Sequence, residues 1–228
     1  MKKGIMDLGH NLIAVCTCIV ILLGGCVTTE QNSKQSIGSA VSSGDVVAVK
    51  HLIASGVDVN TELGSFSGLP PTSTPLLIAV SEGNVEMVTL LVSNGANVNQ
   101  LTGGGVTPLG LASQLGRKDI VEILLKSKTA DVNGISTLGA TPLHEAAKAG
   151  HRDVAEILIQ QGANVNVQVT RWKMQYRITD QKGTRIEERE AAIWSSALEP
   201  KGITPLGLAL KYGRAETAEY LRSVGAKE

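Results

Sequence analysis

The residues best suited to metal binding or nucleophilic catalysis are four histidines and three cysteines, scattered over 228 residues. The sequence contains no H-E-x-x-H metal motif, no G-x-S-x-G nucleophile elbow and no Walker A loop. The stretch 64–68 (GSFSG) comes nearest to an elbow, but Phe66 stands where the serine should be. We therefore expect no enzyme, no metal and no cofactor; a hydrolase that uses paired carboxylates is the weakest alternative.

All three cysteines lie near the N-terminus. Cys16 and Cys18 have the spacing of a ligand pair, but they lie inside an apolar run, residues 12–23 (LIAVCTCIVILL). A membrane span needs about 20 residues, so this run is too short and fits the core of a secretory signal peptide. We expect residues 1–25 to be a signal peptide that is removed, and both cysteines with it.

The stretch 23–26 (LGGC) resembles the lipobox of bacterial lipoproteins, in which a leucine and two small residues precede a lipidated cysteine. The resemblance implies that Cys26 carries the lipid and that residues 26–34 form a polar tether. Because Val27 stands where an aspartate would retain the protein at the inner membrane, we expect an outer-membrane anchor in the bacterial envelope, facing the periplasm. An ordinary signal peptide or a short membrane anchor is the alternative.

The rest of the chain repeats itself. Thr-Pro-Leu occurs four times, and each copy continues with a central glycine; a G-A-x-V-N type ending closes most copies. The third Thr-Pro-Leu copy shows the logic: Thr141 can cap a helix, Pro142 fits its first turn, and Gly150 permits the left-handed turn that ends it. An apolar outer helix follows, and Gly162 ends that helix. Each copy therefore predicts two helices.

These copies resemble the ankyrin repeat over residues 35–166 and 204–228. The resemblance implies an all-α solenoid of five helix-turn-helix repeats, because one repeat alone cannot bury its apolar face. It also implies that His144, in Thr-Pro-Leu-His, hydrogen-bonds neighbouring turns. We expect a repeat domain over 35–228, with repeats near 35–73, 74–106, 107–140, 141–166 and 204–228.

Two joints between repeats are longer than the others. The last asparagine of a copy and the next Thr-Pro-Leu are eight residues apart at two joints, but 14 from Asn60 and 38 from Asn166. Both insertions therefore fall at the same place within the repeat, a short one after Asn60 and a long one at 167–203. Insertions in repeat proteins often lie on the binding side.

The long insertion holds both tryptophans of the chain. Alternation from Gln168 to Thr179 predicts a strand, and Thr184 then has the spacing of a helix cap, which predicts strand-turn-helix. A two-stranded hairpin that continues to Trp194 is the alternative. Aromatic residues and arginines dominate the energetics of protein interfaces, so a binding arm is one interpretation and packing onto the solenoid is the other. The predicted contacts are Arg171, Trp172, Lys173, Tyr176, Arg177 and Trp194.

The ankyrin resemblance implies further contact positions on the solenoid itself. At the ends of the inner helices these are Ser81, Glu82, Gln114, Leu115, Lys148, Lys211 and Tyr212, and at the turn tips they are Gly103, Gly104, Thr137 and Leu138.

The expected function is protein binding. The formal net charge is zero, which gives no reason to expect nucleic acid as a partner. The chain resembles lipidated ankyrin-repeat immunity proteins, which implies a monomer that sterically neutralises a secreted antibacterial effector, such as a type VI phospholipase. The alternative is an envelope accessory protein that docks or stabilises a resident enzyme.

Overall fold

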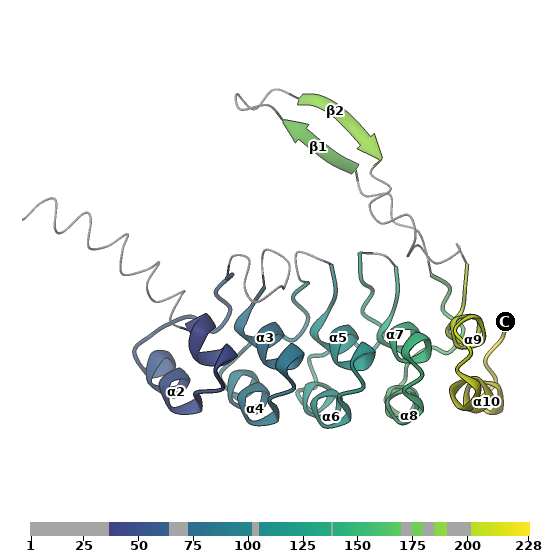
Figure 1. The fold of residues 1–228 in the computed structure, drawn as a ribbon, viewed down its shortest axis with the longest axis horizontal. Helices are drawn as coiled ribbons and strands as arrows, with labels where there is room; N and C mark the ends of the chain where they lie inside the picture. The colour runs from purple at the N-terminus through teal and green to yellow at the C-terminus, as the bar shows by residue number, and fades with distance from the viewer. Residues whose placement is uncertain are drawn as a thin grey trace, which may run out of the picture.

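The protein is a row of paired helices in the computed structural model (Figure 1). The structure describes residues 37–63, 73–101, 105–137, 139–169, 175–179, 185–190 and 202–228. The inner helices, α3, α5, α7 and α9, form one layer, and the outer helices, α2, α4, α6, α8 and α10, form a second layer beside it. The prediction of an all-α solenoid of helix-turn-helix repeats is confirmed.

The helices keep nearly constant lengths from repeat to repeat. Helical residues 37–42 come first, and the others are α2 (Val46–Ala54), α3 (Pro75–Glu82), α4 (Val85–Ser93), α5 (Pro108–Gln114), α6 (Lys118–Lys126), α7 (Pro142–Ala149), α8 (Arg152–Gln160), α9 (Pro205–Lys211) and α10 (Ala215–Ser223).

Each Thr-Pro-Leu sequence begins an inner helix in the way its residues predict. The Thr107 hydroxyl accepts a hydrogen bond from the Gly110 N–H at 3.0 Å, and the following proline occupies the first turn, where no N–H is needed. In α7 the cap is completed by His144, whose ring lies 3.2 Å from the Thr141 nitrogen. Gly150 ends α7 with a φ of +90°, a left-handed conformation that glycine adopts at no steric cost.

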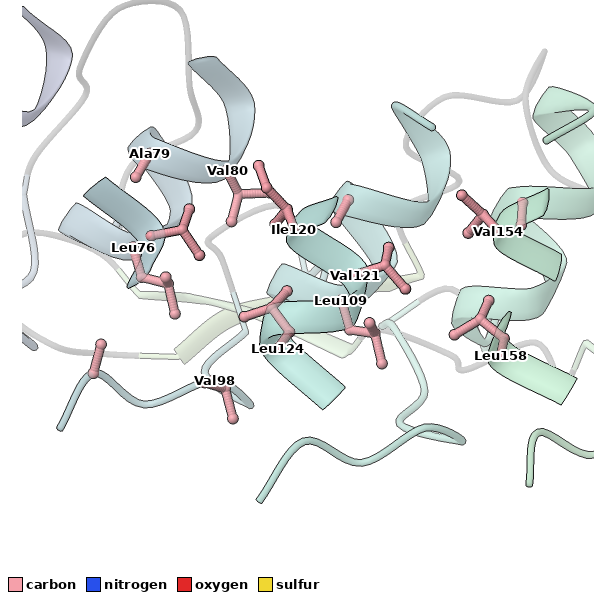
Figure 2. Packing of buried hydrophobic residues seen from close by; sticks show 14 of the residues in the cluster. Leu76, Ala79, Val80, Val98, Leu109, Ile120, Val121, Leu124, Val154 and Leu158 are labelled. Atoms are coloured by element: carbon pink, nitrogen blue, oxygen red, sulfur yellow. The ribbon is translucent and has the colours of Figure 1, made fainter. Parts of the chain in front are cut away.

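The core is a narrow aliphatic layer between the two rows of helices (Figure 2). In the fourth repeat, Leu143, Ala146 and Ala147 of α7 are fully buried against Val154 and Leu158 of α8. Small residues on the inner helices let neighbouring repeats approach closely, and each buried leucine or valine contributes about 1.5–3 kcal/mol by leaving water. The same pattern in every repeat extends one continuous core along the row.

Asparagine side chains in the turns that follow the outer helices join each repeat to the next. The Asn133 amide donates to the Gly162 carbonyl at 3.2 Å, and its oxygen accepts the Asn164 N–H at 2.9 Å. Asn60 makes the same two bonds to Gly95 and Asn97. The G-A-x-V-N ending is therefore a connector between repeats, in addition to ending one.

The long insertion contains an antiparallel hairpin of β1 (Gln175–Thr179) and β2 (Arg185–Glu190). The predicted helix after Thr184 is wrong over residues 185–190, and the hairpin alternative is confirmed there. A five-residue strand leaves its backbone groups unpaired on both sides, and a neighbouring antiparallel strand satisfies them, which outweighs a local helix cap. Ile193, Trp194 and Ala197 lie outside the described residues.

Candidate functional site

The base of the long insertion lies at the opposite end of the inner helices from Lys148, Lys211 and Tyr212. The insertion joins the repeats before Thr204, at the N-terminal end of α9, whereas these three residues lie at the C-terminal ends of α7 and α9. An eight-residue helix such as α7 is about 12 Å long at 1.5 Å per residue. The base of the insertion and the three predicted contact residues therefore occupy two separate regions of the solenoid.

A line of turns follows the C-terminal ends of the inner helices, and we call this line, with the helix residues beside it, the central-turn edge. It comprises the turns from inner to outer helix in the five repeats, at residues 43–45, 83–84, 115–117, 150–151 and 212–214. Each turn contains one glycine with positive φ, at Gly44, Gly83, Gly116, Gly150 and Gly213.

Three of the predicted contact residues come together on this edge. The Lys148 Nζ and the Lys211 Nζ each lie 5.3 Å from the centroid of the Tyr212 ring. Cations at this distance are attracted by the negative face of the ring. Tyr212 remains 38% exposed. The fold thus gathers two ammonium groups around one accessible aromatic side chain, although Lys148 lies 64 positions before Tyr212 in the sequence.

The other predicted positions at the inner-helix ends also lie on or beside this edge. Glu82 and Gln114 are exposed, Ser81 is half-buried, and Leu115, the C-terminal cap of α5, is 41% exposed. Leu115 therefore does not pack fully against its neighbouring repeats. Thr137, predicted at a turn tip, is half-buried.

A row of stacked side chains crosses the edge, and the sequence interpretation missed it. The residue after each central glycine lies over the glycine of the preceding repeat: Arg117 over Gly83, and Arg214 over Gly150. A Cβ atom on Gly150 would lie 2.7 Å from the Arg214 Cδ atom, so a side chain there would collide. The Arg214 Nε also donates to the Lys148 carbonyl at 3.1 Å. The available signal was the polar residue after each aligned glycine, which is an arginine or a histidine in the last three repeats.

His151 occupies the same position in the fourth repeat. Its ring lies over Gly116, where a Cβ atom would be 2.5 Å from Cε1, and its Nε2 lies 3.2 Å from the Gln114 carbonyl oxygen. These contacts give His151 a structural role in joining the fourth repeat to the third.

The charge of the edge reverses along the row. The charges are counted over six residues of each repeat, from two before the central glycine to three after it. Over these residues, repeats 1 and 2 carry three acidic residues, Asp45, Glu82 and Glu86, and no basic residue. The last three repeats carry six basic residues against three acidic ones. The basic residues are Arg117, Lys118, Lys148, Arg152, Lys211 and Arg214, and the acidic ones are Asp119, Asp153 and Glu216. The net formal charge therefore changes from −3 to +3 along one edge.

At the other end of the inner helices, backbone hydrogen bonds close the base of the long insertion. The Val169 N–H donates to the Ile203 carbonyl, and the Gly202 N–H donates to the Val169 carbonyl, both at 3.0 Å. Below this bridge lies the fully buried His144, whose Nε2 is 3.3 Å from the same Ile203 carbonyl. With Nδ1 accepting the Thr141 N–H, Nε2 carries the proton and donates.

The protonation of His144 follows from its burial. Loss of water lowers the pKa of the ring from 6.5 to about 4, against the opposing effect of the hydrogen bonds to Ile203 and Val167. The ring is therefore neutral at pH 7 and acts as a connector between the α7 cap and both ends of the insertion. This confirms the expected role of His144.

Several predicted residues lie outside the described part of the chain, namely Cys26, Gly103, Gly104, Leu138, Arg171, Trp172, Lys173 and Trp194. Tyr176 and Arg177 lie on β1, opposite Arg189 and Glu188 of β2.

The described residues also bear on other kinds of site. They contain no group of three or more histidine, cysteine, aspartate or glutamate residues that could hold a metal ion. None of their helices has the length and apolar character needed to cross a membrane. An open hollow between α6 and α8 has Leu125 and Ile157 in its lining, with polar residues around them.

Comparison with known proteins finds the model for ankyrin repeats over residues 37–136 and 105–169. The E3 ubiquitin-protein ligase XBAT33 of Arabidopsis thaliana is 36% identical over 93 residues, which are 41% of this chain and 17% of the ligase. The ankyrin repeat and KH domain-containing protein mask-1 of Caenorhabditis elegans is 34% identical over 111 residues, 48% of this chain and 4% of mask-1. The human 2-5A-dependent ribonuclease is 50% identical over 52 residues, 22% of this chain and 7% of the ribonuclease. The chain thus spans less than a fifth of each of these relatives.

Proposed function

The chain belongs to the ankyrin-repeat family, and we propose that it is a membrane-anchored module that binds and sterically blocks another protein. An ankyrin-repeat domain is an interaction scaffold that typically has no catalytic site of its own. The relatives carry different activities in their names, and each shares only a small part of its length with this chain. The shared part is the repeats, so protein binding is the property that the resemblance supports.

The central-turn edge is the observation that carries the proposal. A surface that serves only solubility would carry both signs of charge evenly, whereas the net formal charge of this edge changes from −3 in repeats 1 and 2 to +3 in repeats 3–5. It also exposes Leu115 and Tyr212, at 41% and 38%, between the charged residues. Exposed apolar and aromatic groups within a charged surface are typical of interfaces.

The more specific proposal is an immunity protein. The lipobox-like stretch before Cys26 supports a lipid anchor on the bacterial outer membrane, with the repeats in the periplasm. There the module would cover the active-site mouth of a secreted effector such as a phospholipase. Inhibition of this kind requires a fitting surface and no chemistry from the repeats.

The experiment is a capture from periplasmic extract with three versions of the chain from Thr28 onward. The first is unchanged, the second has residues 170–201 replaced by Asn-Gly, and the third has the substitutions Arg117→Gln, Lys148→Gln and Lys211→Gln. Mass spectrometry identifies the captured protein, and inhibition of its purified activity tests the blocking role.

The outcomes separate the alternatives. An effector that is captured and inhibited supports immunity. A resident envelope enzyme that is captured and stabilised supports the accessory role instead. Capture of no specific partner by the unchanged chain contradicts the proposed function. Loss of capture with the second version alone assigns binding to the insertion, and loss with the third alone assigns it to the central-turn edge.

A further inference from the structure

The basic half of the central-turn edge is built from two kinds of well-placed cation. Arg117 and Arg214 lie flat over Gly83 and Gly150 of the preceding repeats. Lys148 and Lys211 lie against the Tyr212 ring. Both kinds of contact restrict long side chains before any partner arrives, which reduces the entropy lost on binding.

Several of these cations keep their charge available. Within the described residues, Arg117, Lys118, Arg152 and Arg214 form no ion pair with a carboxylate, and the ion pairs found, Lys126 with Glu122 and Arg222 with Glu228, lie away from this edge. Arg152 lies 5.7 Å from the Tyr220 ring, and Arg214 donates one N–H to a backbone carbonyl. Neither contact neutralises the positive charge, so Arg152 and Arg214 keep their charge for an anionic partner.

The reversal of charge limits the size and shape of an anionic partner. Asp45, Glu82 and Glu86 face any ligand that reaches the first two turns. A long nucleic acid or a flat anionic membrane that followed the whole edge would meet these carboxylates and be repelled. A short segment along repeats 3–5 would meet six basic and three acidic residues, a net formal charge of +3, with the Arg117 side chain extending over Gly83 of repeat 2.

The spacing of the repeats specifies the backbone of such a segment. Packed helices lie about 8–10 Å apart, so equivalent turns of neighbouring repeats recur at about that distance. A polyproline II helix rises about 3.1 Å per residue with three residues per turn, so every third side chain points the same way about 9 Å further on. A carboxylate at every third residue would therefore meet successive turns of the edge.

We propose that the central-turn edge of repeats 3–5 binds an extended, proline-rich acidic segment of a protein partner, with carboxylates at every third position. The inference rests on the proposed protein-binding function and names the partner's chemistry. The carboxylates would contact Arg117, Lys148, Lys211 and Arg214, and Leu115 and Tyr212 would contact the prolines between them.

The test measures binding of two synthetic peptides to the chain from Thr28 onward. The first peptide contains four Glu-Pro-Pro triplets. The second has the same composition, with its four glutamates together at one end. We expect the first to bind about 10-fold more tightly than the second, and its affinity to fall as salt is raised because the contacts are ionic.

Matched variants locate the site. Arg117→Gln, Lys148→Gln and Lys211→Gln together should weaken the first peptide about 10-fold or more. Lys50→Gln, Lys126→Gln and Lys227→Gln remove the same charge from exposed residues elsewhere and should change the affinity by less than about 2-fold. Circular dichroism and thermal unfolding confirm that both triple variants are folded.

Equal affinity for the two peptides, equal loss in both triple variants, or stronger binding to duplex DNA or phosphatidylglycerol vesicles than to the first peptide would each overturn the inference. The proposed function is judged separately by the capture experiment. If the edge variant captures the same partner as the unchanged chain, this inference fails while protein binding stands. If no partner is captured but the first peptide binds as described, the proposed function fails while the edge specificity stands.

Discussion

The two ends of the inner helices follow different rules of length. At the central-turn end, the central glycine follows the threonine of Thr-Pro-Leu after nine residues in all four copies. At the opposite end, the joint from the last asparagine to the next Thr-Pro-Leu is 8, 8, 14 or 38 residues long. One end of the repeat is therefore fixed and the other is open to insertion.

The contacts at each end explain the difference. Each central turn of repeats 2–4 is covered by a side chain of the next repeat, so an extra residue would displace Arg117, His151 or Arg214. At the joints, an inserted segment needs only to leave the solenoid and return to it at neighbouring residues. Backbone bonds close the two insertions, from the Leu63 N–H to Ser73 at 2.8 Å and from the Val169 N–H to Ile203 at 3.0 Å. In this protein, insertions occur where backbone hydrogen bonds alone close the base of the inserted segment. The length is constant where side chains of the next repeat stack on the turn.

The largest expected effect is at the buried connector of the joint end. His144→Leu removes the acceptor of the Thr141 N–H and one of two donors to the Ile203 carbonyl, which keeps its bond from the Val169 N–H. An unsatisfied buried group costs about 1–3 kcal/mol, and the loss of the second hydrogen bond adds about 1 kcal/mol. We expect the free energy of unfolding at pH 7 to fall by about 3 kcal/mol. Urea denaturation measures this, with the exposed His51→Leu as the control, which should change stability by less than about 0.5 kcal/mol.

The same variant tests the pH dependence. The pKa of His144 is lowered from 6.5 to about 4 in the folded state, so its neutral form stabilises the fold above pH 6.5. That stability, about 3 kcal/mol in total, is lost as the pH falls from 6.5 to 4, because the unfolded chain binds the proton first. The slope of stability against pH in this range should be smaller in His144→Leu than in the unchanged protein. An identical slope in both would show that another group dominates.

A matched pair of glycines tests whether stacking fixes the central turns. Gly116 and Gly213 share a φ of +67°, but a Cβ atom on Gly116 would lie 2.5 Å from His151, whereas one on Gly213 meets nothing within 4 Å. Gly213→Ala should cost about 1 kcal/mol for the left-handed backbone alone, and Gly116→Ala about 2–3 kcal/mol. Equal losses in thermal unfolding would mean that the stacked histidine moves away freely and does not fix the turn.

Shortening the long insertion tests the end of the repeat that varies in length. Replacement of residues 170–201 by Asn-Gly leaves Val169 and Gly202 positioned to form the same bridge across a two-residue turn. The shorter loop costs less closure entropy, so we expect stability to rise by about 1 kcal/mol. A loss of more than about 2 kcal/mol would instead support the interpretation that the insertion packs on the solenoid and contributes to its core.

The smallest expected effect concerns one residue at the end of α6. Lys128 has a φ of +58°, while Gly56, Gly95, Gly162 and Gly225 supply the positive φ after the other outer helices. Lys128→Gly should raise the free energy of unfolding by about 0.5–1 kcal/mol, because glycine removes the strain of a left-handed lysine. A decrease would show that the Lys128 side chain stabilises the fold more than its backbone strain destabilises it.

Local sequence patterns were enough to predict the helices and their ends. Thr141, Pro142 and Gly150 act within one helix over a few residues, so their roles can be read without knowing the fold. The interior residues Leu143, Ala146 and Leu158 could be assigned from helical periodicity for the same reason. The insertion was ambiguous because its length and alternation suit either a helix or a second strand after Thr184, and pairing between distant residues decided it.

The candidate site divides in the same way. Lys148, Lys211 and Tyr212 were predicted from their place in the repeat, but that two lysines contact one ring follows from the packing of α7 against α9. The roles of Arg117 and Arg214 depend on glycines in other repeats, 34 and 64 residues earlier in the chain. The sequence by itself determined the repeats, their caps and the reversal of charge between copies, because these depend on neighbouring residues and on alignment. Only the tertiary structure decided which side chains meet, because stacking the repeats brings residues from different copies within contact distance and sets their directions.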